Sequence, residues 1–161
     1  MPGHGVRVLI ADDDEHVREA ISDRLEHFGV VVVQASDGLA ALAAMRQRRF
    51  NVVVTDYHMP GLDGLGFLRQ CRLSWPGTPV ILMSAMFEAT EQLAAARSAF
   101  SCLRKPFDAN RLITLVLQAA HLSLTLDPPL SGPASNTGPS VAPGSPKQTG
   151  LITGCFGGGA A

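Results

Sequence analysis

Short β-branched runs alternate with longer segments of helical periodicity over most of the chain. The runs are residues 6–11, 30–34, 52–55, 80–83 and, with a weaker pattern, 101–104. Runs of this length that alternate with amphipathic segments are typical of parallel strands joined by crossover helices. The pattern therefore predicts an α/β fold: a five-stranded parallel sheet with helices on both faces.

Apolar spacing and capping residues locate the helices between these strands. The first helix carries Val17, Ala20, Ile21, Leu25 and Phe28 at helical spacing, and Gly29 marks its C-terminal end. Asp37 predicts the start of a second helix, which carries Ala41, Leu42 and Met45. A third helix is expected after Asp63 and Gly64, and a fourth near Thr90.

The fifth helix has the clearest signal. Pro106 precedes Asp108, a good N-cap residue. A broad apolar stripe follows, made of Leu112, Ile113, Leu115, Val116, Ala119 and Leu122. The complete pattern predicts a doubly wound sandwich of five strand-helix units.

The composition changes sharply after this helix. Residues 127–161 contain six prolines and many Gly and Ser, but only Asp127 and Lys147 as charged residues. Such a segment buries too little apolar surface to offset the entropy lost on ordering. We therefore expect one folded domain at residues 1–126 and a disordered Pro/Gly/Ser-rich tail at residues 127–161.

Charge and apolar content narrow the range of partners and locations. Lys and Arg total 13 against 14 Asp and Glu, so the net charge of −1 attracts the molecule neither to nucleic acid nor to an anionic membrane. No apolar run approaches the roughly 20 residues that span a bilayer, and the N-terminus lacks a signal-peptide core. We expect a cytoplasmic protein. Three widely spaced cysteines, Cys71, Cys102 and Cys155, match no metal-ligand pattern.

Polar residues follow four of the five expected strands. Asp12 and Asp13 follow the first, Asp56 the third, Ser84 the fourth and Lys105 the fifth. In open α/β sheets, ligands bind beside the carboxyl ends of the strands, where the strand order reverses. Carboxylates that face one another need a cation, and oxygen ligands of this kind suit Mg²⁺.

Four segments at these strand ends resemble the receiver domain of response regulators in two-component signalling. They are residues 8–14 (VLIADDD), 54–64 (VTDYHMPGLDG), 81–85 (ILMSA) and 105–107 (KPF). The resemblance covers about residues 5–124 and spans all five strands. It implies a flavodoxin-like (βα)5 sandwich and a single-domain switch similar to chemotaxis-type regulators.

The resemblance also implies a role for each residue at the strand ends. Asp56 would accept a phosphoryl group from a sensor histidine kinase or a phosphotransfer protein. Asp13 and Asp56 would bind Mg²⁺ directly, Asp12 would act largely through water, and the backbone carbonyl of His58 would complete the protein ligands.

Two further side chains would contact the phosphoryl group. Lys105 would supply an ammonium, directed inward by a cis peptide bond to Pro106, and Ser84 would donate its hydroxyl. The domain would catalyse only its own phosphorylation and dephosphorylation, and is not expected to be an enzyme in the usual sense.

The output would then be a protein-protein contact. No helix-turn-helix motif or basic recognition helix follows Leu126, so direct DNA binding is not expected. The downstream protein would bind the face formed by the fourth helix, the fifth strand and the fifth helix.

The chain departs from the family pattern at several positions. An aromatic residue is usual three positions before the lysine, where this chain has Cys102. The nearest aromatic, Phe100, would share a strand face with Cys102 if the segment is extended. His58 and Met86 occupy two positions that tune hydrolysis in the family.

Two alternative functions remain open from the sequence. A degenerate receiver could act as an interaction module that does not depend on phosphorylation, which the Cys102 departure favours. A phosphatase with an aspartyl nucleophile is suggested by the spacing of Asp12 and Asp14, but it would leave Asp56 without a role. We assign Asp14 and Glu15 to the negative first turn of the first helix and not to the site.

Overall fold

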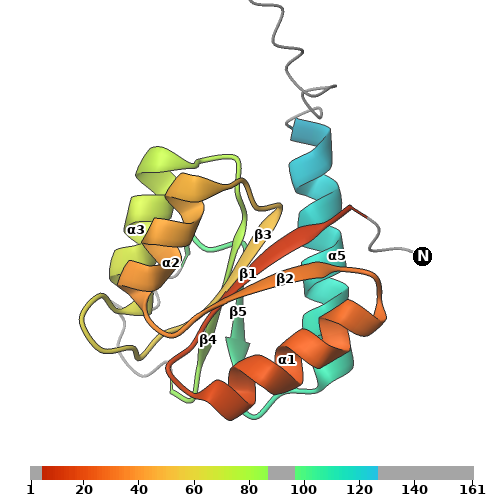
Figure 1. Cartoon of the computed structure of the whole chain (residues 1–161), viewed down its shortest axis with the longest axis horizontal. Helices are drawn as coiled ribbons and strands as arrows, with labels where there is room; N and C mark the ends of the chain where they lie inside the picture. Colours follow the sequence, from red (N-terminus) through yellow and green to blue (C-terminus); the bar gives the residue numbers. More distant parts are fainter. Residues whose placement is uncertain (1–4, 87–96, 127–161) are drawn as a thin grey trace, which may run out of the picture. The chain divides into compact units, whose positions relative to one another are not determined.

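Five strands and four helices alternate along the part of the chain that the computed structural model describes, residues 5–86 and 97–126 (Figure 1). The strands are β1 (Arg7–Ala11), β2 (Val31–Ala35), β3 (Val52–Asp56), β4 (Val80–Ser84) and β5 (Ser101–Arg104). The helices are α1 (Glu15–His27), α2 (Gly38–Gln47), α3 (Gly64–Ser74) and α5 (Ala109–Leu126). The helix expected near Thr90 and the tail expected at residues 127–161 lie outside the described residues.

The sheet is parallel throughout, with the strand order β2-β1-β3-β4-β5. The chain first moves from β1 to β2 on one side and then returns to place β3 on the other side of β1. The strand order therefore reverses at β1 and β3, which pair from Val8 opposite Val52 to Ala11 opposite Thr55. The carboxyl ends of these two strands lie side by side, and the predicted fold class is confirmed.

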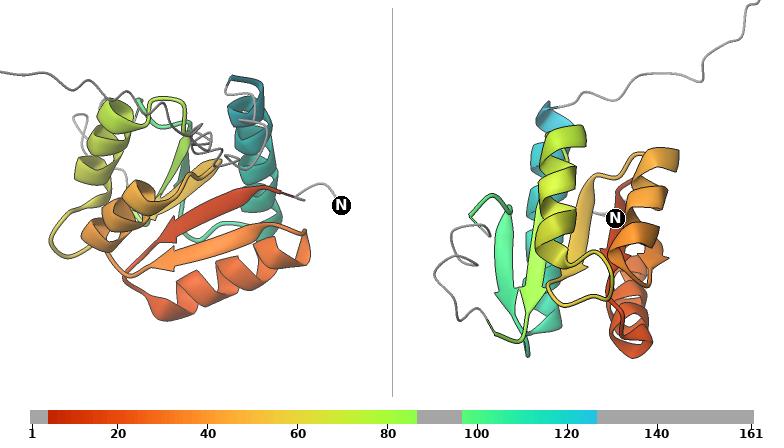
Figure 2. Two further views of the ribbon diagram at one scale, coloured as in Figure 1. Left: turned by 45° about the horizontal axis from the view of Figure 1, so that its top comes forward. Right: turned by 90° about the vertical axis from the view of Figure 1, so that its left-hand side faces the viewer.

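Helices cover both faces of the sheet (Figures 1 and 2). On one face, Leu9, Val53 and Leu82 pack against residues of α2 and α3, including Leu42 and Phe67. On the other face, the alternate strand residues Val8, Ile10, Val54 and Ile81 pack against α1 and α5, including Leu25, Leu112 and Val116. Burial on both faces explains why the strands read as nearly continuous apolar runs and not as an alternating pattern.

Aspartates begin all four helices in the described part of the chain. The side chains of Asp14, Asp37, Asp63 and Asp108 accept hydrogen bonds from backbone N–H groups in the first turns of α1, α2, α3 and α5. These bonds satisfy donors that a helix start otherwise leaves unpaired. Gly29 follows α1 with φ +79°, the left-handed conformation expected after a helix end.

Two expectations about side-chain placement are wrong. Leu122 was assigned to the apolar stripe of α5, but it is 44% exposed. Phe100 precedes β5 and packs on the α1/α5 face of the sheet, whereas Cys102 pairs with Leu82 and so lies on the opposite face. The strand starts only at Ser101, so the alternation that would place Phe100 and Cys102 together does not reach back to Phe100.

None of the helices in residues 5–86 and 97–126 combines the length and the apolar character needed to span a membrane.

Gly64 allows the start of α3 to approach the end of β3. A Cβ atom at this position would lie 2.2 Å from the backbone oxygen of Asp56 and 2.8 Å from the Cα of Tyr57. These neighbours are backbone atoms, so they cannot move aside cheaply. The approach therefore fixes where the chain turns after Asp56.

We expect Gly64→Ala to lower the free energy of unfolding by roughly 1–3 kcal/mol, the usual effect of overpacking. The better helix propensity of Ala, worth up to about 1 kcal/mol, acts in the opposite direction and is the smaller effect. Gly77→Ala is the matched control, because a Cβ there meets no atom within 4 Å. Urea denaturation of both variants tests this; equal stability of the two would contradict the steric account.

Candidate functional site

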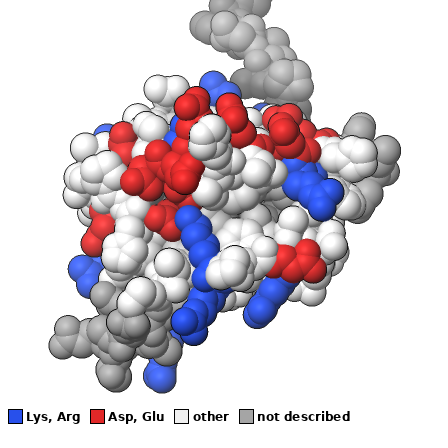
Figure 3. All heavy atoms as spheres, turned by 90° about the horizontal axis from the view of Figure 1, so that it is seen from below, with Lys and Arg blue, Asp and Glu red and all other residues white. Residues whose placement is uncertain are grey.

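Three carboxylates converge at the carboxyl ends of β1 and β3. Asp12 and Asp13 follow β1 directly, and Asp56 is the last residue of β3. Oxygen atoms of the three side chains lie within 4.8 Å of one another. Asp12 and Asp56 are only 1% and 7% exposed, whereas Asp13 is exposed. The view from below in Figure 3 shows Asp and Glu side chains gathered on this side of the molecule.

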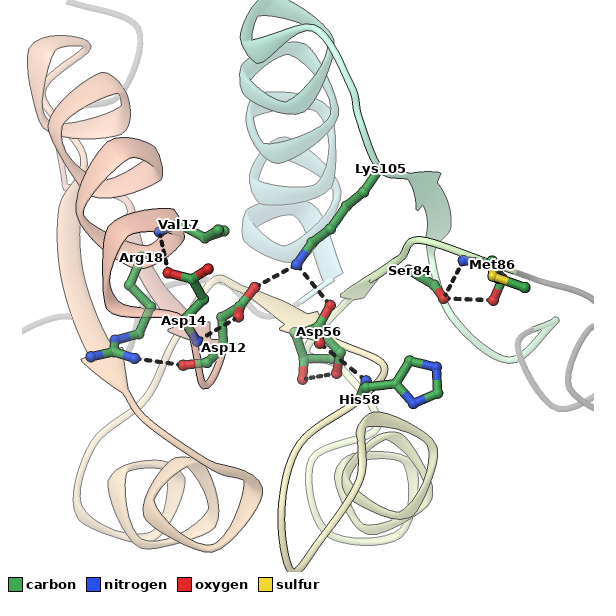
Figure 4. Close-up of polar contacts among 10 residues, drawn as sticks. Asp12, Asp14, Val17, Arg18, Asp56, His58, Ser84, Met86 and Lys105 are labelled. Atoms are coloured by element: carbon green, nitrogen blue, oxygen red, sulfur yellow. Dashed lines mark hydrogen bonds and ion pairs between the residues drawn. The ribbon is translucent and has the colours of Figure 1, made fainter.

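Lys105 connects this cluster to the far side of the sheet. It follows β5, and its side chain extends past β4 toward the other strand ends (Figure 4). Its Nζ lies 2.8 Å from Oδ2 of Asp12 and 2.9 Å from Oδ1 of Asp56. The peptide bond from Lys105 to Pro106 is cis, as the resemblance implied.

Burial and charge act in opposite directions on these groups. Burial raises the pKa of Asp12, and the hydrogen bonds from Lys105 and from the backbone N–H of Asp14 offset this only in part. Burial alone would lower the pKa of Lys105, but its hydrogen bonds to Asp12 and Asp56 outweigh burial and raise it. The ammonium therefore stays protonated, and one positive charge faces three carboxylates.

Such a site fits a hard divalent cation. The donors are carboxylate oxygens at mutual distances that one ion can bridge, and the single ammonium leaves the cluster with excess negative charge. Soft ligands are absent from this group of three residues. The chemistry of the donor set is therefore that of a site for a hard divalent cation.

Both oxygens of Asp56 are held by the protein. Oδ1 faces Lys105, and Oδ2 accepts a hydrogen bond of 3.1 Å from the backbone N–H of His58. The loop between β3 and α3 is fixed by two backbone hydrogen bonds. One runs from the Tyr57 N–H to the carbonyl of Met83, and the other from the Gly64 N–H to the carbonyl of Tyr57. The carboxylate is thus fixed in orientation at the edge of the sheet. The exposed ring of His58 packs against Tyr57, with ring centroids 4.7 Å apart.

Ser84 lies at the predicted strand end, but its hydroxyl is bonded within its own loop. It donates to the backbone carbonyl of Met86 at 2.7 Å and accepts from the backbone N–H of Met86 at 3.1 Å (Figure 4). The residue is fully buried. To contact a group bound at Asp56, this hydroxyl would have to leave Met86.

Asp14 is adjacent to the carboxylate cluster in sequence but has a different task. Its side chain accepts hydrogen bonds from the backbone N–H groups of His16 and Val17 at the start of α1. A phosphatase mechanism based on Asp12 and Asp14 would need this carboxylate for chemistry, so the capping role argues against it.

The sequence reasoning missed one residue beside the site. Arg18, on α1, donates from Nη1 to the backbone carbonyl of Asp12 at 2.7 Å (Figure 4). The available signal was a basic residue in the second turn of a helix that starts with an acidic run. That signal gives no indication of which carbonyl the guanidinium would reach.

Comparison with known proteins agrees with this arrangement. The model of the response regulator receiver domain family matches residues 8–117. Response regulator protein FleR of Pseudomonas aeruginosa is 37% identical over 115 residues, which are 71% of this chain and 24% of FleR. The chain therefore spans about a quarter of the length of that relative.

Solved structures show the same similarity. The receiver domain of a Francisella response regulator is 32% identical, with a TM-score of 0.68 over 73% of this chain and 98% of that one. Response regulator TrrA from Thermotoga maritima, solved in complex with Mg²⁺-BeF, is 25% identical, with a TM-score of 0.66 over 71% of this chain and 98% of that one. On the family match and these likenesses together, the chain belongs to the response regulator receiver domain family.

Proposed function

We propose that this receiver domain is a phosphorylation switch in which Asp56 accepts a phosphoryl group with the help of Mg²⁺. The donor is the phosphohistidine of a sensor histidine kinase or a phosphotransfer protein. The observation that carries the proposal is the position of Lys105, whose Nζ lies within 2.9 Å of both Asp12 and Asp56. A half-buried ammonium beside one oxygen of a fixed carboxylate suits a reaction that builds up negative charge there.

Asp12, Asp13, Asp56 and the backbone carbonyl of His58 would hold the metal, with Asp12 acting largely through water. The cluster of three carboxylates supports this assignment, as does the Mg²⁺-BeF complex of TrrA. Bound Mg²⁺ would neutralise charge on the phosphoryl oxygens during transfer.

The transfer itself needs only one nucleophile. A carboxylate oxygen of Asp56 forms a bond to phosphorus while the bond from phosphorus to the donor imidazole nitrogen breaks and its electron pair returns to the ring. The product is an acyl phosphate on Asp56. Lys105 would then face the phosphoryl oxygens, with its charge maintained by the neighbouring carboxylates.

Ser84 would convert this chemistry into a structural signal. Its hydroxyl would exchange the carbonyl of Met86 for a phosphoryl oxygen, which would draw the loop after β4 inward. The downstream protein would bind the face formed by the helix expected near Thr90, β5 and α5. With Cys102 in place of an aromatic residue, the response of this face would be transmitted by other side chains.

The proposal includes a cytoplasmic location. It also includes no direct contact with nucleic acid or a membrane, and the net charge of −1 supports this second part. The domain acts as a regulator and catalyses only its own phosphorylation and dephosphorylation.

Phosphorylation by acetyl phosphate, followed by intact mass spectrometry at increasing Mg²⁺ concentrations, tests this function. We expect the wild-type protein to gain one phosphoryl group, and to gain none when EDTA removes the metal. An unmodified wild-type protein at saturating Mg²⁺ would contradict the proposal and favour an interaction module that works without phosphorylation.

The three consecutive aspartates provide a sharper test of the metal site. Asp13→Asn is expected to raise the Mg²⁺ concentration that gives the half-maximal phosphorylation rate at least about tenfold. Metal affinity already falls by about this factor when a residue that only hydrogen-bonds to a metal ligand is replaced. Asp14→Asn should behave like the wild type, because Asn caps a helix as well as Asp does. Equal metal dependence of the two variants would contradict the assignment of Asp13.

A further inference from the structure

The Asp12 backbone is held on several sides at the end of β1. Its N–H donates to the carbonyl of Ala35 on β2 at 3.2 Å, and its carboxylate accepts from Lys105 and from the backbone N–H of Asp14. The remaining polar atom is the backbone carbonyl, which lies beyond the last paired residue of β1. This carbonyl accepts the 2.7 Å hydrogen bond from Arg18.

The carbonyl held by Arg18 belongs to the peptide bond between Asp12 and Asp13. The orientation of that peptide plane decides where the chain places Asp13. Asp13 is the exposed member of the carboxylate cluster, and within residues 5–86 and 97–126 its side chain makes no hydrogen bond. Its position beside Asp12 and Asp56 therefore depends on the backbone that carries it.

We propose that Arg18 is a positioning residue for the metal site. Its guanidinium fixes the peptide plane between Asp12 and Asp13, so that the Asp13 carboxylate is presented to the cation before the cation binds. Arg18 is partly buried and reaches the carbonyl from the second turn of α1. The inference rests on the proposed function, because it concerns the same metal site.

Two effects of Arg18 on metal binding have opposite signs. As a positive charge near the carboxylates, Arg18 repels a cation, so its removal by charge alone would tighten Mg²⁺ binding. Arg18 is also a hydrogen-bond donor that orders the backbone beside Asp13. Its removal therefore weakens Mg²⁺ binding, because the protein must then order Asp13 when the metal binds. The sign of the change separates the two roles.

Calorimetric titration of Mg²⁺ into Arg18→Met tests the proposal, since Met keeps an unbranched stem and removes the donor. We expect the dissociation constant to rise by about tenfold, the lower end of the range for outer partners of metal ligands. The phosphorylation rate at saturating Mg²⁺ should be unchanged. Arg18→Lys, which retains a donor, should restore part of the affinity.

Arg24→Met is the matched control, because it removes the same charge from an exposed position near the end of α1. Its Mg²⁺ affinity should equal that of the wild type. A second measurement needs no metal: the hydrogen exchange rate of the Asp14 backbone amide, which donates to Asp12 Oδ1. This amide should exchange faster than in the wild type in Arg18→Met but not in Arg24→Met.

The outcomes separate this inference from the proposed function. If the wild-type protein binds Mg²⁺ and Arg18→Met binds it equally well or more tightly, the positioning role is wrong while the metal site stands. If the wild-type protein binds no Mg²⁺ at all, the proposed function fails first. Equal loss of affinity in Arg18→Met and Arg24→Met would also overturn the inference, since it would indicate an effect on α1 that does not depend on the hydrogen bond to Asp12.

Discussion

An Asp56→Asn variant is expected to take up no phosphoryl group from acetyl phosphate and Mg²⁺ under conditions that modify the wild-type protein. The amide lacks the anionic oxygen that attacks phosphorus, and it also removes a negative charge from the proposed metal site. Intact mass spectrometry of the two proteins after equal incubation is the measurement. A variant that gains a phosphoryl group at the wild-type rate would show that another residue is the acceptor.

Asp63→Asn is the control for this experiment. Asp63 lies at the end of the loop that follows Asp56, and its carboxylate caps α3 by accepting from the backbone N–H of Gly66 at 2.7 Å. Asn is an equally good N-cap, so the helix is retained. This variant should be phosphorylated like the wild type, and circular dichroism should show all three proteins folded.

Replacement of Lys105 by Met is expected to change two properties in opposite directions. The phosphorylation rate should fall roughly a hundredfold, a typical loss when one donor to a developing charge is removed. The affinity for Mg²⁺ should rise, because the ammonium that lies 2.8 Å from Asp12 and 2.9 Å from Asp56 no longer competes with the cation. Rate measurements at saturating Mg²⁺ and calorimetric titration check the two effects separately.

Lys105→Arg tests whether charge alone is sufficient. It keeps the positive charge but replaces a compact ammonium by a planar group of different reach. We expect its Mg²⁺ affinity to remain near that of the wild type while its phosphorylation rate stays low. A Lys105→Met variant with an unchanged rate and an unchanged Mg²⁺ affinity would remove Lys105 from the mechanism.

The strands and most helix starts could be predicted from the sequence because local patterns determine them. The five strand predictions lie within one residue of the observed bounds, and Asp37 and Asp63 begin helices as their capping propensity indicated. The convergence of Asp12, Asp13 and Asp56 was also predictable, since parallel strands bring their carboxyl ends to one edge of a sheet.

Other features depend on geometry that no local pattern contains. Phe100 was misplaced because β5 begins one residue later than the alternation required. The partner of Arg18 is a backbone carbonyl six positions earlier, which becomes a neighbour only when the chain turns from β1 into α1.

The most direct test of the account identifies the residue that carries the phosphoryl group. Borohydride reduces an aspartyl phosphate to homoserine, so reduction of the phosphorylated protein followed by peptide mass spectrometry marks the acceptor. The account predicts conversion at position 56 and at no other aspartate. Conversion at Asp12, Asp13 or Asp63, or a phosphorylated protein with no converted aspartate, would contradict it.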